Sequence, residues 1–202
     1  MDEHRWTWQE LEAHYLAADN PRGQSGFGGD EARWEMARRV IADCIERDGD
    51  FLDIGCASGL LMESVAAWTA DRGLRVEPYG LDASAKLAEL ARSRLPEWAG
   101  RIFTGDALTW QPPRRFDVVR TELVYVPEAR ESDYVQRLLD VCVAPCGRLL
   151  VCSYGSSRRP SPRVEPIDEQ LAAWGFTVGG FVETVDPANG IPVTRVAWID
   201  AS

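Results

Sequence analysis

The sequence lacks any apolar run that approaches the roughly 18 residues needed to cross a bilayer. Its first residues, Met1 to Gln9, are charged and polar, without the apolar core of a signal peptide. The chain has 5 cysteines, an odd number, so a full set of intramolecular disulfides is not indicated. We therefore predict a reduced, cytoplasmic protein that does not associate with membranes.

Basic residues and metal-ligating patterns are also scarce. The chain has 22 Lys and Arg residues against 32 Asp and Glu residues, a net charge of −10. Binding of nucleic acid depends on clustered basic side chains that neutralise phosphates, so we predict no nucleic-acid partner. Cys142 and Cys146 are closely spaced, but no second cysteine pair or nearby histidine completes a set of four ligands. We predict no metal site.

The order of the predicted elements indicates the fold class. Strands are predicted at 50–55, 75–82, 101–105, 116–122 and 147–154, and helices at 59–71, 84–94 and 131–143. Such alternation predicts an α/β domain in which helices cover both faces of a largely parallel sheet. Ligands of such sheets bind beyond the carboxyl ends of the strands.

The chain of 202 residues, 45% of them hydrophobic, fits a single domain in two parts. Residues 1–48 are predicted to form a helical arm or lid, with helices at about 6–18 and 30–47 and a mobile glycine-dense loop between them. Residues 49–202 form the core. Near its end, the Pro-, Ser- and Arg-rich segment 154–163 is either a surface connection or part of a lid.

The stretch from Phe51 to Leu61 is the most informative part of the sequence. An apolar run ends at Asp53 and is followed by small residues and an amphipathic segment, which predicts a strand, a tight turn and a helix start. Such a turn brings backbone N–H groups close to a ligand and suits an anionic group. A dinucleotide-binding turn requires a small residue at the position of Leu60, whereas here the small residue is Gly59. This spacing disfavours an NAD-dependent oxidoreductase.

With Asp53 two residues before Gly55, the turn resembles the first motif of class I S-adenosylmethionine-dependent methyltransferases. The resemblance continues through residues 80–84, 104–107 and 116–119, which are similar to the later motifs of that family in the same order. It implies a Rossmann-like fold, a seven-stranded, mostly parallel sheet whose last strand is antiparallel. Segments 175–178 and 191–199 are expected to form the terminal hairpin.

The resemblance also implies a cofactor and the residues that hold it. S-adenosylmethionine would be the methyl donor and S-adenosylhomocysteine the product. Asp82 would hold the ribose hydroxyls, Asp106 the adenine amino group, and Arg33 the cofactor's carboxylate. The full set of implied contacts is Arg33, Asp53, Gly55, Cys56, Ala57, Ser58, Gly59, Asp82, Ala83, Asp106, Ala107 and Glu122.

Some of these residues have simpler interpretations. Ser84 is a good N-cap for the following helix, so Asp82 could belong to ordinary turn chemistry. Arg33 could merely lie on a helix surface. Cys56 is interpreted as a small packing residue rather than as a reactive thiol.

Three side chains are candidates for a catalytic role. Glu122 and Tyr125 follow the predicted strand 116–122, where the family resemblance places residues beside the sulfonium and the acceptor, and either could act as a base or orient the acceptor. His14, in the arm, is a third candidate because its ordinary pKa suits proton transfer. The alternatives are that Glu122 caps a helix or pairs with Arg120, that Tyr125 belongs to the core, and that His14 lies on a surface helix.

The acceptor is less well defined than the cofactor. The Asn/Asp-Pro-Pro-aromatic signature that implies methylation of nucleobase or amide nitrogens is absent after the strand 116–122. We predict a small-molecule acceptor, methylated on oxygen or nitrogen, with specialised metabolism as a setting, and a monomer or homodimer. The open alternatives are a peptide or protein acceptor and a catalytically silent protein that only binds the cofactor.

Overall fold

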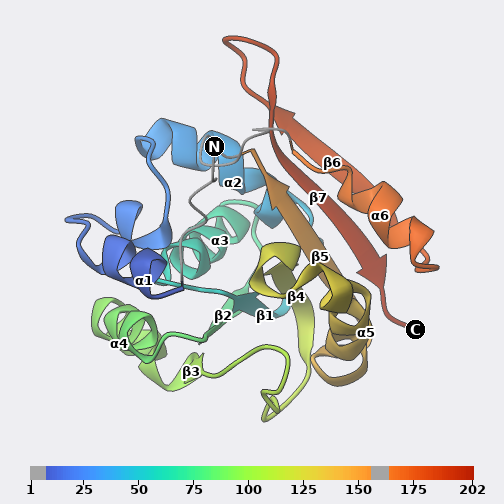
Figure 1. Ribbon diagram of the computed structural model, residues 1–202, viewed down its shortest axis with the longest axis horizontal. Coiled ribbons are helices and arrows are strands. Elements are labelled where there is room, and N and C mark those ends of the chain that lie inside the picture. The colour runs from blue at the N-terminus through green and yellow to red at the C-terminus, as the bar shows by residue number, and fades with distance from the viewer. Residues whose placement is uncertain (1–7, 156–163) are drawn as a thin grey trace.

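A computed structural model of the protein describes residues 8–155 and 164–202. Within these residues one seven-stranded sheet has the order β3-β2-β1-β4-β5-β7-β6. Its strands are β1 (Gly49–Ile54), β2 (Val76–Asp82), β3 (Ile102–Thr104), β4 (Phe116–Glu122), β5 (Val143–Tyr154), β6 (Gly180–Val185) and β7 (Pro192–Asp200). The pairs among β1 to β5 are parallel, and β7 is antiparallel to both β5 and β6 (Figure 1). The predicted sheet with an antiparallel last strand is confirmed.

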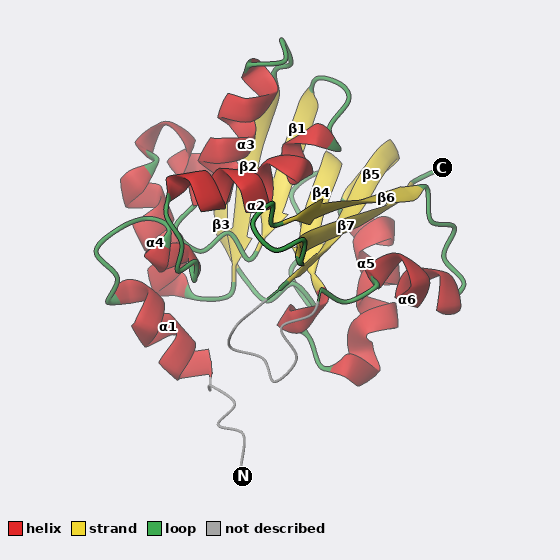
Figure 2. Cartoon of the chain, turned by 90° about the horizontal axis from the view of Figure 1, so that it is seen from above, coloured by secondary structure: helices red, strands yellow, loops and turns green. Residues whose placement is uncertain are grey.

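Helices cover both faces of this sheet (Figure 2). They are α1 (Trp8–Leu16), α2 (Glu31–Asp43), α3 (Leu60–Ala70), α4 (Ala85–Arg94), α5 (Glu131–Val141) and α6 (Ile167–Ala173). On one face, Trp34 and Ile41 of α2 pack with Val65 of α3 in one apolar cluster, whereas α5 and α6 pack into a separate cluster on the opposite face. None of the helices in the described ranges is long and apolar enough to cross a membrane.

Three element boundaries differ from the predictions by more than two residues. The strand expected at 175–178 is a connection, and the outer strand β6 begins at Gly180 instead. Gly175 adopts φ +90°, which ends α6, and the following Phe176 and Val178 pack against the α5/α6 core rather than pairing in the sheet. The hydrophobic pattern of this segment therefore reflects burial in a loop.

The other two differences lie at the end of α2 and the start of β5. The second helix was predicted to continue to residue 47, but it ends at Asp43, because the N–H groups of Cys44 and Ile45 bond to carbonyls three residues back. β5 starts at Val143, four residues earlier than predicted, because an irregularity in its pairing with β4 lets Val143 join the ladder. The predicted helix from residue 6 begins at Trp8 in the structure, since residues 6 and 7 lie outside the described part.

The carboxyl end of β4 is fixed to α5 by a buried pair of hydroxyl groups. Thr121 and Tyr134 are each fully buried, and their hydroxyl oxygens are 2.6 Å apart. Successive side chains of a strand point to opposite faces, so Thr121 faces α5 while Arg120 and Glu122 face α2 and α3. This bond positions the strand end that carries two charged side chains.

Substitution of Tyr134 tests this anchor. Tyr134→Phe leaves the Thr121 hydroxyl buried without its partner, and we expect the free energy of unfolding to fall by about 1–2 kcal/mol in urea titrations. Adding Thr121→Val removes the unsatisfied group, so the double variant is expected to be no less stable than Tyr134→Phe alone. Additive losses from the two substitutions would contradict a direct hydroxyl pair.

Candidate functional site

The turn after β1 has the backbone geometry that its small residues suggest. Gly55, Ala57 and Gly59 adopt φ values of +78°, +47° and +77°. Such angles are accessible to glycine without strain, and Gly59 serves as the N-cap of α3. The N–H groups of Gly55 and Cys56 both bond to the carbonyl of Leu81, at 2.7 and 3.1 Å. The turn is thereby tied to the end of β2.

Asp82 lies at the end of β2, directly beside this turn. One carboxylate oxygen accepts a hydrogen bond from the N–H of Ala57, and the other accepts from the N–H of Ser84, each at 2.8 Å. Burial raises the pKa of Asp82, and these two backbone bonds oppose that rise. The adjacent Ala83 is exposed. Each carboxylate oxygen can accept a second bond, so Asp82 can still hold ligand hydroxyl groups.

Asp106 follows β3 on the same edge. The N–H of Gly105 bonds to the carbonyl of Asp82 at 3.0 Å, which holds the ends of β2 and β3 together. The Asp106 side chain is exposed and accepts a bond from the N–H of Leu108 at 2.8 Å, while Ala107 is half-buried. Because β3, β2 and β1 are neighbours, Asp106, Asp82 and Asp53 lie at successive strand ends.

The N-terminal arm docks onto this edge of the sheet. The hydroxyl of Ser58, in the turn, is completely buried and lies 2.7 Å from the hydroxyl of Ser25 and 3.0 Å from the carbonyl oxygen of Pro21. Farther along the arm, Glu12 of α1 accepts bonds from the Ser84 hydroxyl at 2.5 Å and from Lys86 at 2.8 Å. The arm therefore contacts both the turn and the start of α4.

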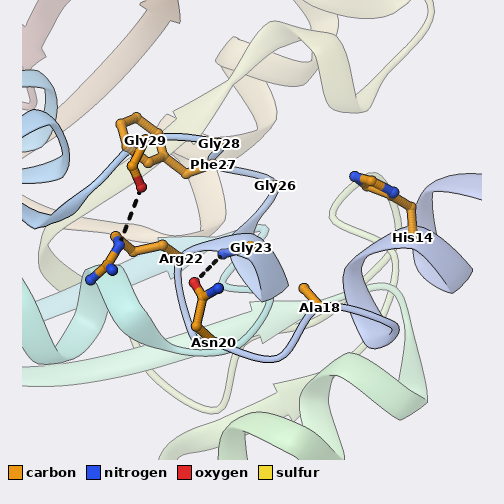
Figure 3. A pocket seen from close by; sticks show the side chains of 9 residues that line it. All are labelled: His14, Ala18, Asn20, Arg22, Gly23, Gly26, Phe27, Gly28 and Gly29. Atoms are coloured by element: carbon orange, nitrogen blue, oxygen red, sulfur yellow. Dashed lines mark hydrogen bonds between the residues drawn. The ribbon is translucent and has the colours of Figure 1, made fainter.

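A cavity of about 280 Å³ lies within the arm, between α1 and the glycine-dense loop (Figure 3). Its lining residues are His14, Ala18, Asn20, Arg22, Gly23, Gly26, Phe27, Gly28 and Gly29. All of these lining residues belong to the arm. The exposed His14 therefore faces a cavity of the arm, and its predicted role in proton transfer stays a prediction.

A buried arginine connects the ends of β1, β4 and β5. Arg120 is only 3% exposed. One terminal nitrogen donates to Asp53 at 3.1 Å, to the carbonyl of Ile54 at 3.2 Å and to the Tyr125 hydroxyl at 3.1 Å. The other donates to Glu122 and, at 2.8 Å, to the Tyr154 hydroxyl. We call Arg120, Asp53, Glu122, Tyr125 and Tyr154 the arginine cluster.

Burial governs the protonation of this cluster. It raises the pKa of Asp53 from 3.8 to about 6, although the Arg120 charge opposes the rise. Burial would by itself lower the pKa of Arg120, but the surrounding tyrosines and carboxylates raise it well above its ordinary value. Burial also raises the pKa of Tyr125 and Tyr154 well above the ordinary range. The arginine therefore stays charged and both phenols keep their protons at neutral pH.

Tyr125 and Glu122 place this cluster against the glycine turn. The Tyr125 ring lies directly on Gly55, where an added Cβ would come within 2.4 Å of the ring. The Tyr125 hydroxyl also donates to Glu122 at 2.8 Å. The structure thus shows the Glu122–Arg120 pair that the sequence left as an alternative, and it also brings both predicted catalytic residues to the turn.

Two of the predicted cofactor residues have other contacts. Arg33 donates to Asp186, in the turn between β6 and β7, at 3.1 Å. Its contact with a cofactor carboxylate stays a prediction. Cys56 is 2% exposed and packs beside Met62 and Gly80, and burial raises the pKa of its thiol. This agrees with the interpretation of Cys56 as a packing residue.

The sequence reasoning did not select Arg120 or Tyr154 as site residues. The signal for Arg120 was a charged residue between apolar residues of a strand, since a buried charge requires partners. Tyr154 had no comparable signal, because a tyrosine at a strand end is common in cores. Their proximity to Asp53 follows from the strand order β1-β4-β5.

The arrangement combines a glycine turn, carboxylates at three strand ends and a charged cluster beside them. The acids Asp53, Asp82 and Glu122 suit a ligand that carries hydroxyl groups and positive charge. No group of three or more histidine, cysteine, aspartate or glutamate residues within the described ranges could hold a metal ion.

Known proteins share both the sequence pattern and the fold. A family model described as a methyltransferase domain matches residues 51–144. A trans-aconitate 2-methyltransferase from Methylobacterium radiotolerans is 30% identical over 128 residues, which cover 63% of this chain and 46% of that protein. The chain thus spans about half the length of this curated relative.

Solved structures of methyltransferases share the fold of this chain. The N-methyltransferase NodS from Bradyrhizobium japonicum WM9, in complex with S-adenosylhomocysteine, is 16% identical, with a TM-score of 0.58 over 96% of this chain and 97% of that one. The glycopeptide N-methyltransferase MtfA is 16% identical, with a TM-score of 0.61 over 82% of this chain and 89% of that one. These similarities confirm the predicted Rossmann-like architecture.

The raised pKa of Asp53 predicts how stability depends on pH. Its pKa is about 6 in the folded protein and 3.8 as the ordinary value, so the folded protein binds the proton more tightly. The resulting stabilisation is complete below the ordinary pKa and is lost as the pH rises through about 6. The free energy of unfolding of the wild type minus that of Asp53→Asn should therefore decrease by about 1 kcal/mol as the pH rises from about 5 to about 7.

Urea titrations of both proteins at the two pH values measure this difference. Asp140→Asn, on the exposed surface of α5, corrects for the general effect of removing a carboxylate. A difference between wild type and Asp53→Asn that is the same at both pH values would show that Asp53 does not titrate in this range.

Proposed function

The chain belongs to the class I S-adenosylmethionine-dependent methyltransferases, and on that premise we propose that it transfers a methyl group to an oxygen or nitrogen of a small-molecule acceptor. The observation that carries the proposal is the hydrogen bond between Asp82 and the N–H of Ala57. This bond joins the carboxylate at the end of β2, which can accept hydrogen bonds from ribose hydroxyls, to the glycine turn, whose backbone a ligand can approach closely.

The residues of this edge fit the cofactor. Gly55 and Gly59 adopt positive φ values without strain, and Asp82 keeps acceptor capacity for hydroxyl groups. The exposed Asp106, two strands from β1, is free to accept from an adenine amino group. Negative charge on Asp82 and Glu122 favours a ligand with a sulfonium.

The contacts of the arm support a role in holding such a ligand. Ser25 and Pro21 bond to Ser58 of the turn, and Glu12 bonds to the Ser84 that caps α4. These contacts lay the arm across the strand ends, where it can exclude water from the reacting groups. We propose that the arm encloses the cofactor and that its cavity, lined by Phe27 and Arg22, leads toward the acceptor.

When bound, S-adenosylmethionine supplies an activated methyl group on a positively charged sulfur. The protein then has to align the acceptor with that group and keep water away. Tyr125, which covers Gly55, is placed to contact the acceptor or the methyl donor. Arg120 holds both Tyr125 and Glu122 in position, so it is a positioning residue.

Glu122 has two ways to act on an acceptor. A hydroxyl or ammonium acceptor loses a proton during transfer, and Glu122 could receive it. A carboxylate acceptor has no proton to lose, and Glu122 would then only orient Tyr125 and the acceptor. The curated relative is named for the carboxylic acid trans-aconitate, and the structural neighbours are named for nitrogen methylation.

Catalytic activity distinguishes this proposal from a protein that only binds the cofactor. Release of S-adenosylhomocysteine is measured with a panel of carboxylic acids, phenols, amines and short peptides. Turnover on any small molecule supports the proposal, and turnover on peptides alone favours a peptide acceptor. Tight binding of S-adenosylhomocysteine without turnover on any acceptor would favour a protein that only binds the cofactor. Binding of NAD in place of S-adenosylhomocysteine would contradict the proposed methyltransferase activity.

Removing the strand-end acids should weaken cofactor binding. Asp82→Ala deletes the proposed acceptor of the ribose hydroxyl bonds, and we expect affinity for S-adenosylhomocysteine, measured by calorimetry, to fall by roughly 1.5–3 kcal/mol. Asp106→Ala should cause a smaller loss because its side chain is exposed. Asp48→Ala, which removes an exposed pair with Arg75, is the control. Equal affinity in Asp82→Ala and the control would rule out the ribose role.

Substitution of Glu122 should separate binding from turnover. Glu122→Gln keeps the shape of the side chain but removes its charge, so the affinity for S-adenosylhomocysteine should hold while turnover falls by roughly a hundred-fold, the loss for a misplaced or missing group. Glu128→Gln, on the exposed segment after β4, is the matched control. Full activity of Glu122→Gln would remove Glu122 from the reaction.

A further inference from the structure

Arg38, on the face of α2 that packs on the sheet, is stacked among three aromatic rings. Its guanidinium carbon lies 3.5 Å from the centre of the Tyr154 ring and 5.3 and 5.4 Å from those of Phe27 and Trp34. Cation–π contacts of this kind fix a guanidinium group while leaving its N–H groups in the plane available for hydrogen bonds. Arg38 is therefore held in place by groups that use none of its donors.

Few of these donors have partners. Within the part of the chain that the structure describes, Arg38 makes a single hydrogen bond, of 3.4 Å to the carbonyl of Ala37, and has no carboxylate partner. The neighbouring arginines on α2 differ in this respect: Arg33 pairs with Asp186, and Arg39 pairs with Glu35. In a chain with a net charge of −10, a half-buried arginine without an acid is unusual.

Arg38 lies next to the proposed reaction site. The Tyr154 ring that it covers accepts a hydrogen bond from Arg120 through its hydroxyl, at 2.8 Å. Tyr154 thus links Arg38 to the rest of the arginine cluster, which contains Glu122 and Tyr125. Arg38 also lies 5.3 Å from the ring of Phe27, which lines the cavity of the arm (Figure 3). Arg38 therefore contacts both a residue that lines the cavity and a residue of the arginine cluster.

We propose that Arg38 binds a carboxylate of the methyl acceptor, and hence that the acceptors are organic acids. This rests on the function proposed above. A planar guanidinium with free N–H groups on one edge matches a carboxylate, with which it forms two parallel hydrogen bonds. Of the rings that hold Arg38, the half-buried Phe27 and Tyr154 also provide an apolar surface for the carbon skeleton of the acid.

The proposal defines the chemistry when the bound carboxylate is itself the nucleophile. A carboxylate oxygen forms a bond to the methyl carbon as the bond between carbon and sulfur breaks, and the electron pair of that bond returns to sulfur. The products are a methyl ester and S-adenosylhomocysteine, and no proton is transferred. Glu122 then acts by position alone, so the loss of turnover in Glu122→Gln should be the same at all pH values at which the acid is ionised.

Binding measurements on variants of Arg38 test the proposal. The probes are trans-aconitate, succinate and benzoate, each compared with its amide, titrated into the complex with S-adenosylhomocysteine. Arg38→Met keeps the contact with the aromatic rings but removes the donors, and we expect it to weaken binding of the acids by about ten-fold to a hundred-fold. Arg38→Lys keeps the charge but lacks the planar guanidinium, so its affinity for the acids should lie between those of the wild type and Arg38→Met. Arg39→Met is the matched control on the same helix.

The possible outcomes are distinct. Weaker binding of acids by Arg38→Met, with unchanged affinity for S-adenosylhomocysteine and a thermal midpoint close to that of Arg39→Met, supports the assignment. If Arg38→Met lost affinity only for S-adenosylhomocysteine, Arg38 would hold the carboxylate of the cofactor, and the assignment to the acceptor would be overturned. Equal affinity for acids and amides, or no binding of acids by the wild type, would also overturn it. Absence of S-adenosylhomocysteine binding would instead overturn the proposed function itself.

Discussion

The structure depends on a buried positive charge shared by three parallel strands. Arg120 of β4 bonds to Asp53 of β1, to Glu122 at the end of its own strand and to Tyr154 of β5. A charge removed from water is stable only when partners surround it, and loss of one partner of such a pair typically costs about 3–5 kcal/mol. The same bonds that satisfy Arg120 therefore fix the strand ends on which the site is built.

From this cluster the site extends in two directions. Toward the glycine turn, Tyr125 lies on Gly55, and the turn in turn bonds to Asp82 through Ala57. Toward α2, Tyr154 carries the stacked guanidinium of Arg38. The first direction has groups suited to a nucleoside with a sulfonium, and the second has groups suited to an acid. In the function proposed above, the charged cluster between them would align the two reactants, because each of its members is held by at least one other.

The predictions from sequence succeeded where local patterns determine local structure. Small residues at 55, 57 and 59 require a tight turn, and the family resemblance of the motifs gave the sheet with its antiparallel last strand. They failed where apolar residues are buried without forming a strand, as in the segment 175–178, because hydrophobicity reports burial and not backbone pairing. The end of α2 depends on hydrogen bonds to carbonyls three residues back, and the start of β5 depends on an irregularity in its pairing with β4. Neither can be inferred from residue composition.

By itself, the sequence determined the fold class, the turn after β1 and the acids at the ends of β1, β2 and β3. These features can be predicted because strand periodicity and glycine spacing determine backbone structure through interactions among a few neighbouring residues. Only the tertiary structure decided that Arg120 joins Asp53, that the arm bonds to Ser58, and that Arg38 stacks on Tyr154. These partners are 33 to 116 positions apart in the chain, and only strand order and helix packing bring them together.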